Sequence, residues 1–288
     1  MGRITARRRV ARYTVGERIS VRDDHLAVEE PLEIRIGGSP LTMTMRTPGD
    51  DVELATGFLL SEGIVTSAEQ VRAAMHCAPD GEENTYNVLD VTLDPVRAAV
   101  AADLTRAFTT TSACGLCGKS SIDAIRATSA FDLSNDDTVV DAEFIATLPV
   151  RLRGGQSAFE KTGGLHAAAL FDAATGELLV LREDVGRHNA VDKVIGWALA
   201  AGRVAGSGLV LMVSGRASFE LAQKAFMAGI PLLAAVSAPS SLAVEMAEDV
   251  GLGLVGFVRD NRMVVYAGAE RVTNESAAQQ RAVKARTA

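Results

Sequence analysis

The feature that most constrains the fold is the second half of the chain, where short apolar runs alternate with longer amphipathic segments. Residues 208–214 and 232–237 contain the continuously apolar runs LVLMV and LLAAV. Such runs are typical of parallel strands that are buried on both faces of a sheet. Helices are predicted over residues 187–200, 218–227 and 240–250. This alternation predicts an α/β fold in which helices cover a parallel sheet.

Two antiparallel hairpins are expected at the ends of this sheet. The predicted strands are 167–172 with 178–184, and 253–259 with 263–267. A further helix is predicted over residues 142–160. Residues 141–272 are therefore expected to form a three-layer α/β/α domain.

The first half of the chain predicts a smaller α+β domain over residues 13–108. Period-two alternation indicates strands at residues 32–36, 41–45 and 86–93. A helix is predicted from Asp50 to Gly63. The capping box formed by Ser67 and Gln70 predicts a second, short helix that runs toward His76.

Composition excludes several classes of protein. Hydrophobic residues make up 48% of the 288 residues and charged residues 23%, which favours a folded chain with a buried core. The formal charge of −7 argues against nucleic-acid binding as the main activity. No apolar run reaches the roughly 18 residues of a membrane span. We expect a cytoplasmic protein with a basic disordered arm at residues 1–12 and a polar tail at residues 273–288.

The chain has three cysteines, Cys77, Cys114 and Cys117, which are too few for a disulfide scaffold. Cys114 and Cys117 form a C-x-x-C pair in a loop rich in Thr, Ser and Gly, within a linker over residues 109–140. Three functions compete for this pair: half of a zinc site, a redox pair, or a sulfur carrier that forms a persulfide. Lys119 could lower the pKa of the thiols. Cys77 stands alone and is expected to act as a small hydrophobic residue.

Several polar segments of the second domain could bind an anion, because each places Arg, His or small residues at a turn or a helix start. They are residues 162–166 (TGGLH), 183–189 (EDVGRHN), 214–218 (SGRAS) and 237–241 (SAPSS). The side chains of interest there are Arg187, His188, Ser214, Gly215 and Arg216. Arg259 and Arg262 also bracket the turn Asp260-Asn261. We expect these segments to form one crevice for a phosphate-bearing ligand.

Several motifs, taken in order, resemble the formate dehydrogenase accessory sulfurtransferase (FdhD) family. They include TSACGLCGKSSID, TGGLHAAA, REDVGRHNAVDKVIG, SGRASFELAQKA and GFVRDNRMVVY, and the similarity spans about residues 41–266. The resemblance implies a sulfur carrier that takes sulfur from a cysteine desulfurase. The acceptor would be the molybdenum bis(molybdopterin guanine dinucleotide) cofactor of a formate dehydrogenase catalytic subunit.

The resemblance also assigns individual residues. Cys114 matches the persulfide cysteine, and Cys117 is its partner in the motif. The segment matched to cofactor binding comprises Phe257, Val258, Arg259, Asp260, Asn261 and Arg262. A homodimer, guanine-nucleotide binding and a cytidine-deaminase-like second domain are further implications.

Zinc deaminases hold their metal with H-x-E and P-C-x-x-C motifs. Here no cysteine follows Cys117, and Arg187, His188 and Arg216 stand at the corresponding helix starts. We therefore expect an anionic ligand and no permanently bound metal. Two alternatives remain open: a non-catalytic chaperone of the cofactor, and a structural zinc protein whose cysteine pairs meet across a dimer.

Overall fold

The computed structural model describes residues 4–78, 83–110, 129–204 and 208–274, and the side chains of residues 103–110 are not described. Its larger sheet has six strands in the order β13-β12-β11-β10-β8-β9. In chain order these are β8 (His166–Asp172), β9 (Leu178–Asp184), β10 (Leu209–Val213), β11 (Leu232–Ala235), β12 (Gly253–Arg259) and β13 (Arg262–Ala267). The central strands β10, β11 and β12 are parallel, and antiparallel hairpins close both ends, as predicted.

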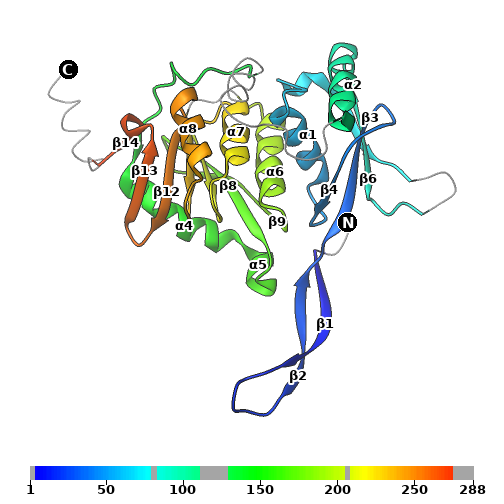
Figure 1. Ribbon diagram of the computed structural model, residues 1–288, viewed down its shortest axis with the longest axis vertical. Coiled ribbons are helices and arrows are strands. Elements are labelled where there is room, and N and C mark those ends of the chain that lie inside the picture. The colour runs from blue at the N-terminus through cyan, green and yellow to red at the C-terminus, as the bar shows by residue number, and fades with distance from the viewer. Residues whose placement is uncertain (1–3, 79–82, 111–128, 205–207, 275–288) are drawn as a thin grey trace.

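Helices cover both faces of this sheet (Figure 1). Those on the larger core are α6 (Arg187–Ala200), α7 (Phe219–Met227) and α8 (Ser241–Val250), while α4 (Ala142–Gly155) packs on the other face. Strand β10 shows why both faces are buried. Leu209 and Leu211 contribute to the larger core, whereas Val210 and Met212 contribute to the core beneath α4. The three-layer α/β arrangement is therefore confirmed.

The first part of the chain forms a second sheet with the strand order β4-β3-β6-β5. Its elements are β3 (Glu30–Ile36), β4 (Ser39–Arg46), α1 (Asp51–Ser61), β5 (Val71–His76), β6 (Val88–Leu93) and α2 (Pro95–Thr110). Short strands β7 (Val140–Asp141) and β14 (Val272–Thr273) pair in parallel elsewhere. Leu32 and Ile34 of β3 belong to the same buried core as the helices of the larger sheet, so the two parts share one core.

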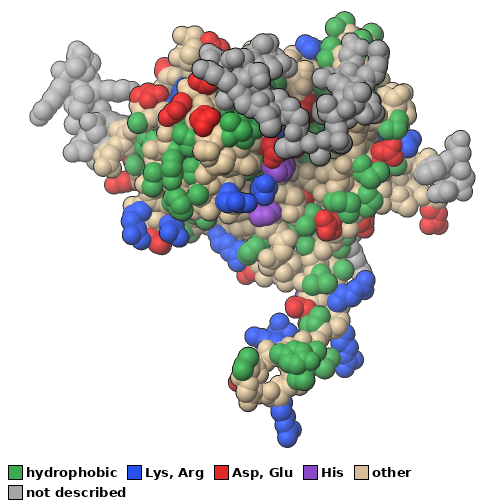
Figure 2. All heavy atoms as spheres, viewed as in Figure 1, with side chains coloured by type: hydrophobic (Ala, Val, Ile, Leu, Met, Phe, Trp, Pro, Cys, Tyr) green, Lys and Arg blue, Asp and Glu red, His purple; other side chains and the backbone are tan. Residues whose placement is uncertain are grey.

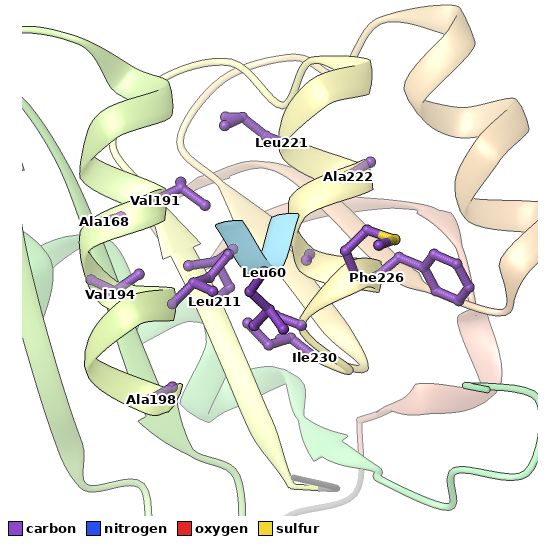
Figure 3. Close-up of a cluster of buried hydrophobic side chains, with 14 of the residues drawn as sticks. Leu60, Ala168, Val191, Val194, Ala198, Leu211, Leu221, Ala222, Phe226 and Ile230 are labelled. Atoms are coloured by element: carbon purple, nitrogen blue, oxygen red, sulfur yellow. The ribbon is translucent and has the colours of Figure 1, made fainter. Parts of the chain in front are cut away.

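Helix α1 lies against α6 and α7 and joins the two sheets. Figure 3 shows Leu60 of α1 among Val191 and Val194 of α6 and Phe226 of α7. The backbones of α1 and α6 approach closely where each has a glycine. A Cβ atom on Gly57 would collide with the carbonyl oxygen of Asp192, and one on Gly196 with the carbonyl oxygen of Glu53. Only glycine fits at either position.

The expectation of a disordered arm at residues 1–12 is wrong for residues 5–12. Strand β1 (Thr5–Arg12) pairs with β2 (Ser20–Ala27) as an antiparallel hairpin. In this register Arg8 lies opposite Asp24 and Arg9 opposite Asp23. Two of the four arginines of β1 therefore lie opposite acidic residues of the strand that follows, and cross-strand pairs of opposite charge stabilise a ladder.

Two predicted helices also differ from the structure. The capping box of Ser67 is present, but it caps only a single 3₁₀ turn, Ala68–Gln70, before β5 pairs with β6. Pairing with a neighbouring strand overrides the local helix signal there. The predicted helix 142–160 is two helices, α4 and α5 (Ser157–Thr162). The carboxylate of Glu183 accepts from the Ala158 and Phe159 amides at 2.9 and 2.7 Å and caps the second one.

No helix in the described part of the chain is both long enough and apolar enough to cross a membrane.

The close approach of α1 and α6 makes a stability prediction. Gly196→Ala should destabilise the fold by about 1–3 kcal/mol or more, because the added methyl group forces two backbones apart. Gly154→Ala on α4 is the matched control, since nothing lies within 4 Å of its added Cβ. Urea denaturation followed by circular dichroism measures both variants. An equal effect of the two substitutions would contradict the close-packing argument.

Candidate functional site

The loops that follow the three parallel strands lie side by side in strand order. The Ser237 amide, after β11, donates to the Gly215 carbonyl at 3.3 Å, and the Phe257 amide donates to the Ser237 carbonyl at 3.2 Å. Ala217 and Pro239 form a parallel bridge one step further out. The segments 214–218 and 237–241 are thus brought together at the carboxyl edge of the sheet, as predicted. Ligands of open α/β sheets bind at such edges.

Arg187, His166 and Ser214 gather at this edge. The Ser214 hydroxyl accepts from the Ala167 amide at 2.9 Å, which holds Ser214 beside the start of β8. A Cβ atom on Gly215 would lie 3.6 Å from Nδ1 of His166. Burial lowers the pKa of His166, and the nearby Arg187 guanidinium lowers it further. Basic side chains and histidines lie side by side on this face in Figure 2.

Two donor atoms at the edge are buried without an acceptor among the described residues. They are Nε of Arg187, the first residue of α6, and the hydroxyl of Ser218, which precedes α7. The Ser218 side chain makes no capping hydrogen bond. Buried polar groups are nearly always paired, so unpaired donors at two helix N-termini indicate a site for an anion. Phosphate suits it because it supplies several acceptor oxygens.

His188 points to a different hollow from the one that His166 and Ser214 line. Its Nε2 lies 2.6 Å from Oε2 of Glu220, in a hollow of about 300 Å³ between β4, α1, α6 and α7. Burial lowers the pKa of His188, and the Glu220 carboxylate opposes this shift. Burial raises the pKa of Asp192 on the same wall, against the opposing effect of Lys224. Glu62, Asp192 and Glu220 line this hollow together with Lys224.

The β12–β13 hairpin is also separate from the Arg187 group. The side chains of Phe257, Arg259, Asn261 and Arg262 line a hollow of about 620 Å³. His166 and Ser214 line another, of about 670 Å³. Val258 is fully buried in the core, so its side chain does not face a ligand. These two groups of side chains line different hollows, Arg187 lines neither of them, and the single crevice stays a prediction. The Phe257 backbone joins the strand-end loops through its amide, and a Cβ atom on the neighbouring Gly256 would lie 3.2 Å from the Ser237 carbonyl oxygen.

The turn of this hairpin has an unusual backbone. Phe257, Asp260 and Asn261 adopt positive φ angles of 52°, 50° and 60°. The pairing of β12 with β13 is irregular between Gly256 and Arg259. Positive φ at Asp260 and Asn261 is ordinary for a two-residue hairpin turn, whereas at Phe257, inside β12, it is uncommon. The segment that the sequence selected is therefore conformationally distinctive.

Cys114, Cys117 and Lys119 lie outside the described residues, so the site described above does not include them. Cys77 is half-buried at the end of β5, where its amide donates to the Val88 carbonyl at 3.0 Å. Its thiol contacts the Met75 carbonyl at 3.8 Å. No three His, Cys, Asp or Glu side chains of the described segments are grouped so that they could hold a metal ion.

Several polar residues of the REDVGRHNAVDK motif hold the two sheets together, which the sequence analysis did not predict. Lys193 forms a buried ion pair with Asp184 at 2.8 Å and donates to the Thr47 carbonyl at 3.0 Å. The side-chain amide of Asn189 donates to the Met45 carbonyl at 2.7 Å and to the Asp184 carboxylate. Asp184 and Lys193 both form hydrogen bonds with Thr47, which precedes them in the chain by 137 and 146 residues. The only sequence signal is the presence of charged residues on an otherwise apolar helix.

His166 was part of a candidate segment but was not assigned to the site. Its place follows from the antiparallel pairing of β8 with β10, which sets the start of β8 beside Ser214.

The electrostatics of His166 predict how it titrates. Its pKa should lie below the ordinary value of about 6.5, because burial and Arg187 favour the neutral imidazole. The stability that this group contributes is complete above about pH 6.5 and is lost as pH falls from there through the folded-state pKa. Proton NMR titration measures it, with His166→Gln identifying the resonance. A pKa at or above 6.5 in the free protein would contradict the proposed surroundings.

Comparison with known proteins agrees with this architecture. Residues 27–273 match the model of the FdhD/NarQ family. The chain is 59% identical over 281 residues to "Sulfur carrier protein FdhD" of Nocardia farcinica, covering 96% of this chain and 98% of that protein. It is 53% identical over 278 residues to the protein of that name from Mycobacterium tuberculosis, covering 95% and 100%.

A crystal structure described as a formate dehydrogenase accessory protein from Desulfotalea psychrophila has the same fold. The TM-score is 0.74 at 24% identity, and the alignment covers 94% of this chain and all of that one. The family model matches residues 27–273 and these relatives cover 95% or more of the chain, so the chain belongs to the FdhD/NarQ family.

Proposed function

We propose that this chain is a cytoplasmic sulfur carrier that serves formate dehydrogenase. It receives sulfane sulfur from a cysteine desulfurase as a persulfide on Cys114. It then delivers this sulfur to the molybdenum bis(molybdopterin guanine dinucleotide) cofactor, which is its substrate. Membership of the FdhD/NarQ family supports the carrier role, since relatives more than 50% identical are named sulfur carrier proteins.

The proposal that the cofactor receives the sulfur is supported by two buried hydrogen-bond donors that have no partner among the described residues. Nε of Arg187 and the Ser218 hydroxyl lie at the starts of α6 and α7. A guanine dinucleotide carries phosphate oxygens, which would accept from both donors and would favour the positive ends of the helix dipoles. The residues present therefore fit the phosphate portion of such a substrate.

The family resemblance implies a cytidine-deaminase-like fold for the second domain. In zinc deaminases the two helices present metal ligands. Here Arg187 and His188 begin α6, whereas Arg216 is exposed in the loop before α7, and no cysteine follows Cys117. Arginine cannot be deprotonated under ordinary conditions and binds oxyanions through several N–H groups. Anion binding is therefore the better assignment than hydrolytic deamination.

The loading step is a thiolate–persulfide exchange. The Cys114 thiolate attacks the terminal sulfur of a persulfide on the desulfurase. A new S–S bond forms on Cys114 while the S–S bond of the donor breaks, and the donor cysteine leaves as a thiolate with the electron pair. Oxidation states balance, because one persulfide is consumed and one is formed.

Release of sulfur has two balanced routes. In the direct route the acceptor supplies the electron pair for a new bond to the terminal sulfur, the S–S bond breaks, and Cys114 leaves as a thiolate, so the acceptor is oxidised by two electrons. In the assisted route the Cys117 thiolate attacks the Sγ atom of Cys114, so that a Cys114–Cys117 disulfide forms and hydrosulfide departs with two electrons. The assisted route then needs an external dithiol to reduce the disulfide. Neither route involves Cys77.

The persulfide assignment predicts a mass change at one residue. After incubation with a cysteine desulfurase and cysteine, the protein should gain about 32 Da, the mass of one sulfur atom. Peptide mapping by mass spectrometry should locate the gain at Cys114. Cys114→Ala should abolish loading, whereas the matched variant Cys77→Ala should load normally.

Other results would select the alternatives. Loading of Cys114→Ala at the wild-type level would overturn the assignment. No added sulfur in the wild type would favour a chaperone that only shields the cofactor. Stoichiometric zinc that is lost with Cys117→Ser would favour the structural zinc protein.

The anion site is tested separately with GDP as the probe. Arg187→Met should weaken GDP binding by about tenfold or more, because a charge-assisted hydrogen bond to phosphate contributes about 1.5–3 kcal/mol. Arg203→Met, which removes an exposed arginine paired with Asp172 at 3.2 Å, is the control. Isothermal titration calorimetry measures both variants. Equal affinities for the wild type and Arg187→Met would remove Arg187 from the site.

A further inference from the structure

His166 lies at the sheet edge where Arg187 and Ser218 offer buried donors without an acceptor among the described residues, and the proposed function gives it no role. It is the first residue of β8 and lies opposite Asp184 in the ladder with β9. A Cβ atom on Gly215 would lie 3.6 Å from Nδ1 and 3.8 Å from Cε1 of the imidazole, so glycine leaves that edge of the ring uncovered by residue 215. Within the described part of the chain, the imidazole has no hydrogen-bond partner.

The Asp184 carboxylate favours the charged form of His166, but both of its oxygens are already bonded elsewhere. Oδ1 accepts from the side-chain amide of Asn189 at 3.0 Å, and Oδ2 accepts from the Thr47 amide at 3.1 Å. Lys193 forms an ion pair with the same carboxylate at 2.8 Å, and Asp184 is fully buried. Lys193 therefore balances most of the negative charge that could stabilise an imidazolium at His166.

The other charged side chains that the structure describes around His166 are cationic. The Arg187 guanidinium of α6 acts on the imidazole, and Arg153 of α4 lines the same hollow of about 670 Å³ as His166. The loop after β10 contributes Ser214 and Gly215, which carry no charge. Burial lowers the pKa of His166, and Arg187 lowers it further. In the free protein a neutral imidazole therefore lies beside a guanidinium whose Nε has no acceptor among the described residues.

We propose that His166 belongs to the anion site and takes up one proton from solvent when a doubly charged oxyanion binds at Arg187. The negative charge of the ligand offsets the guanidinium, so the imidazolium becomes the favoured form. An imidazolium donates a charge-assisted hydrogen bond, which is stronger than the bond from a neutral imidazole. The inference rests on the anion site of the proposed function, and it adds to that site a binding residue whose charge depends on the ligand.

Proton uptake makes the affinity for an anion depend on pH in a defined direction. In the free protein the pKa of His166 lies below its ordinary value of about 6.5, and in the complex it should lie above that value. Between these two pKa values, the affinity for a dianion should rise by up to about tenfold for each unit that pH falls. Outside that range the affinity should be constant, because His166 then has the same charge in the free and bound states.

Sulfate is the probe for this dependence, because it stays a dianion throughout the range in which histidine titrates, whereas phosphate groups titrate there themselves. Proton NMR measures the pKa of His166 with and without saturating sulfate, and isothermal titration calorimetry measures sulfate affinity over the same pH range. His166→Gln keeps a polar side chain without a titrating group, so it should abolish the rise in affinity at low pH.

His25→Gln is the matched control, since His25 is exposed on β2. It should leave the pH dependence unchanged, and thermal melts verify that both variants are folded. His188 is followed in the same NMR titration, because Arg187 also acts on it.

Three results would overturn the assignment of His166 and leave the anion site in place. They are a His166 pKa that stays below about 6.5 in saturating sulfate, a His166→Gln variant with the pH dependence of the wild type, and a rise in pKa at His188 without one at His166. A wild type that binds neither sulfate nor GDP contradicts the anion site itself, and His166 loses its role with it. Sulfur loading of Cys114 is independent of all these results.

Discussion

The rest of the structure depends on the close contact between α1 and α6. Glycines at 57 and 196 let the two backbones meet, and a Cβ atom at either place would collide with a carbonyl oxygen. Polar groups are buried on both sides of this contact. The Asp192 carboxylate accepts from the Ser61 hydroxyl at 2.9 Å and from Lys224 at 2.8 Å, and Lys193 pairs with Asp184. Removing one partner of a buried pair leaves an uncompensated charge, which costs about 3–5 kcal/mol. These pairs therefore define one arrangement of the two sheets.

That arrangement of the two sheets also sets the position of the sheet edge where the candidate anion-binding groups lie. α6 begins at Arg187 directly after the Asp184 anchor, so the residues that join the sheets also set the start of the helix. Ser218 precedes α7, and Lys224 of α7 forms an ion pair with Asp192. Buried donors at both helix starts remain without an acceptor among the described residues. Rigid supports of this kind hold binding groups in place before a ligand arrives.

The sequence predicted most of the larger sheet because each of its elements carries a local signal. The bounds of α6 and β9 agree with the prediction, because apolar runs and helical periodicity depend only on residues that are close in sequence. The site was predicted less well. Arg187 and Ser214 each lie near His166, whereas His188 and the 257–262 hairpin line other hollows. Residue type and strand-end position indicate which loops share an edge, whereas the direction of each side chain depends on packing that no local pattern records.

By itself, the sequence determined the α/β class, the parallel centre of the sheet, the two closing hairpins and the C-x-x-C pair, because these depend on periodicity, turn residues and spacing. Tertiary structure alone decided three matters. It turned the segment after Ser67 into β5, because pairing with β6 outweighs a capping box. It paired the arginine-rich start of the chain with residues 20–27, because opposite charges align across that ladder. It also made Asp184, Asn189 and Lys193 connect the two sheets, because their partners Met45 and Thr47 are more than 130 residues away along the chain.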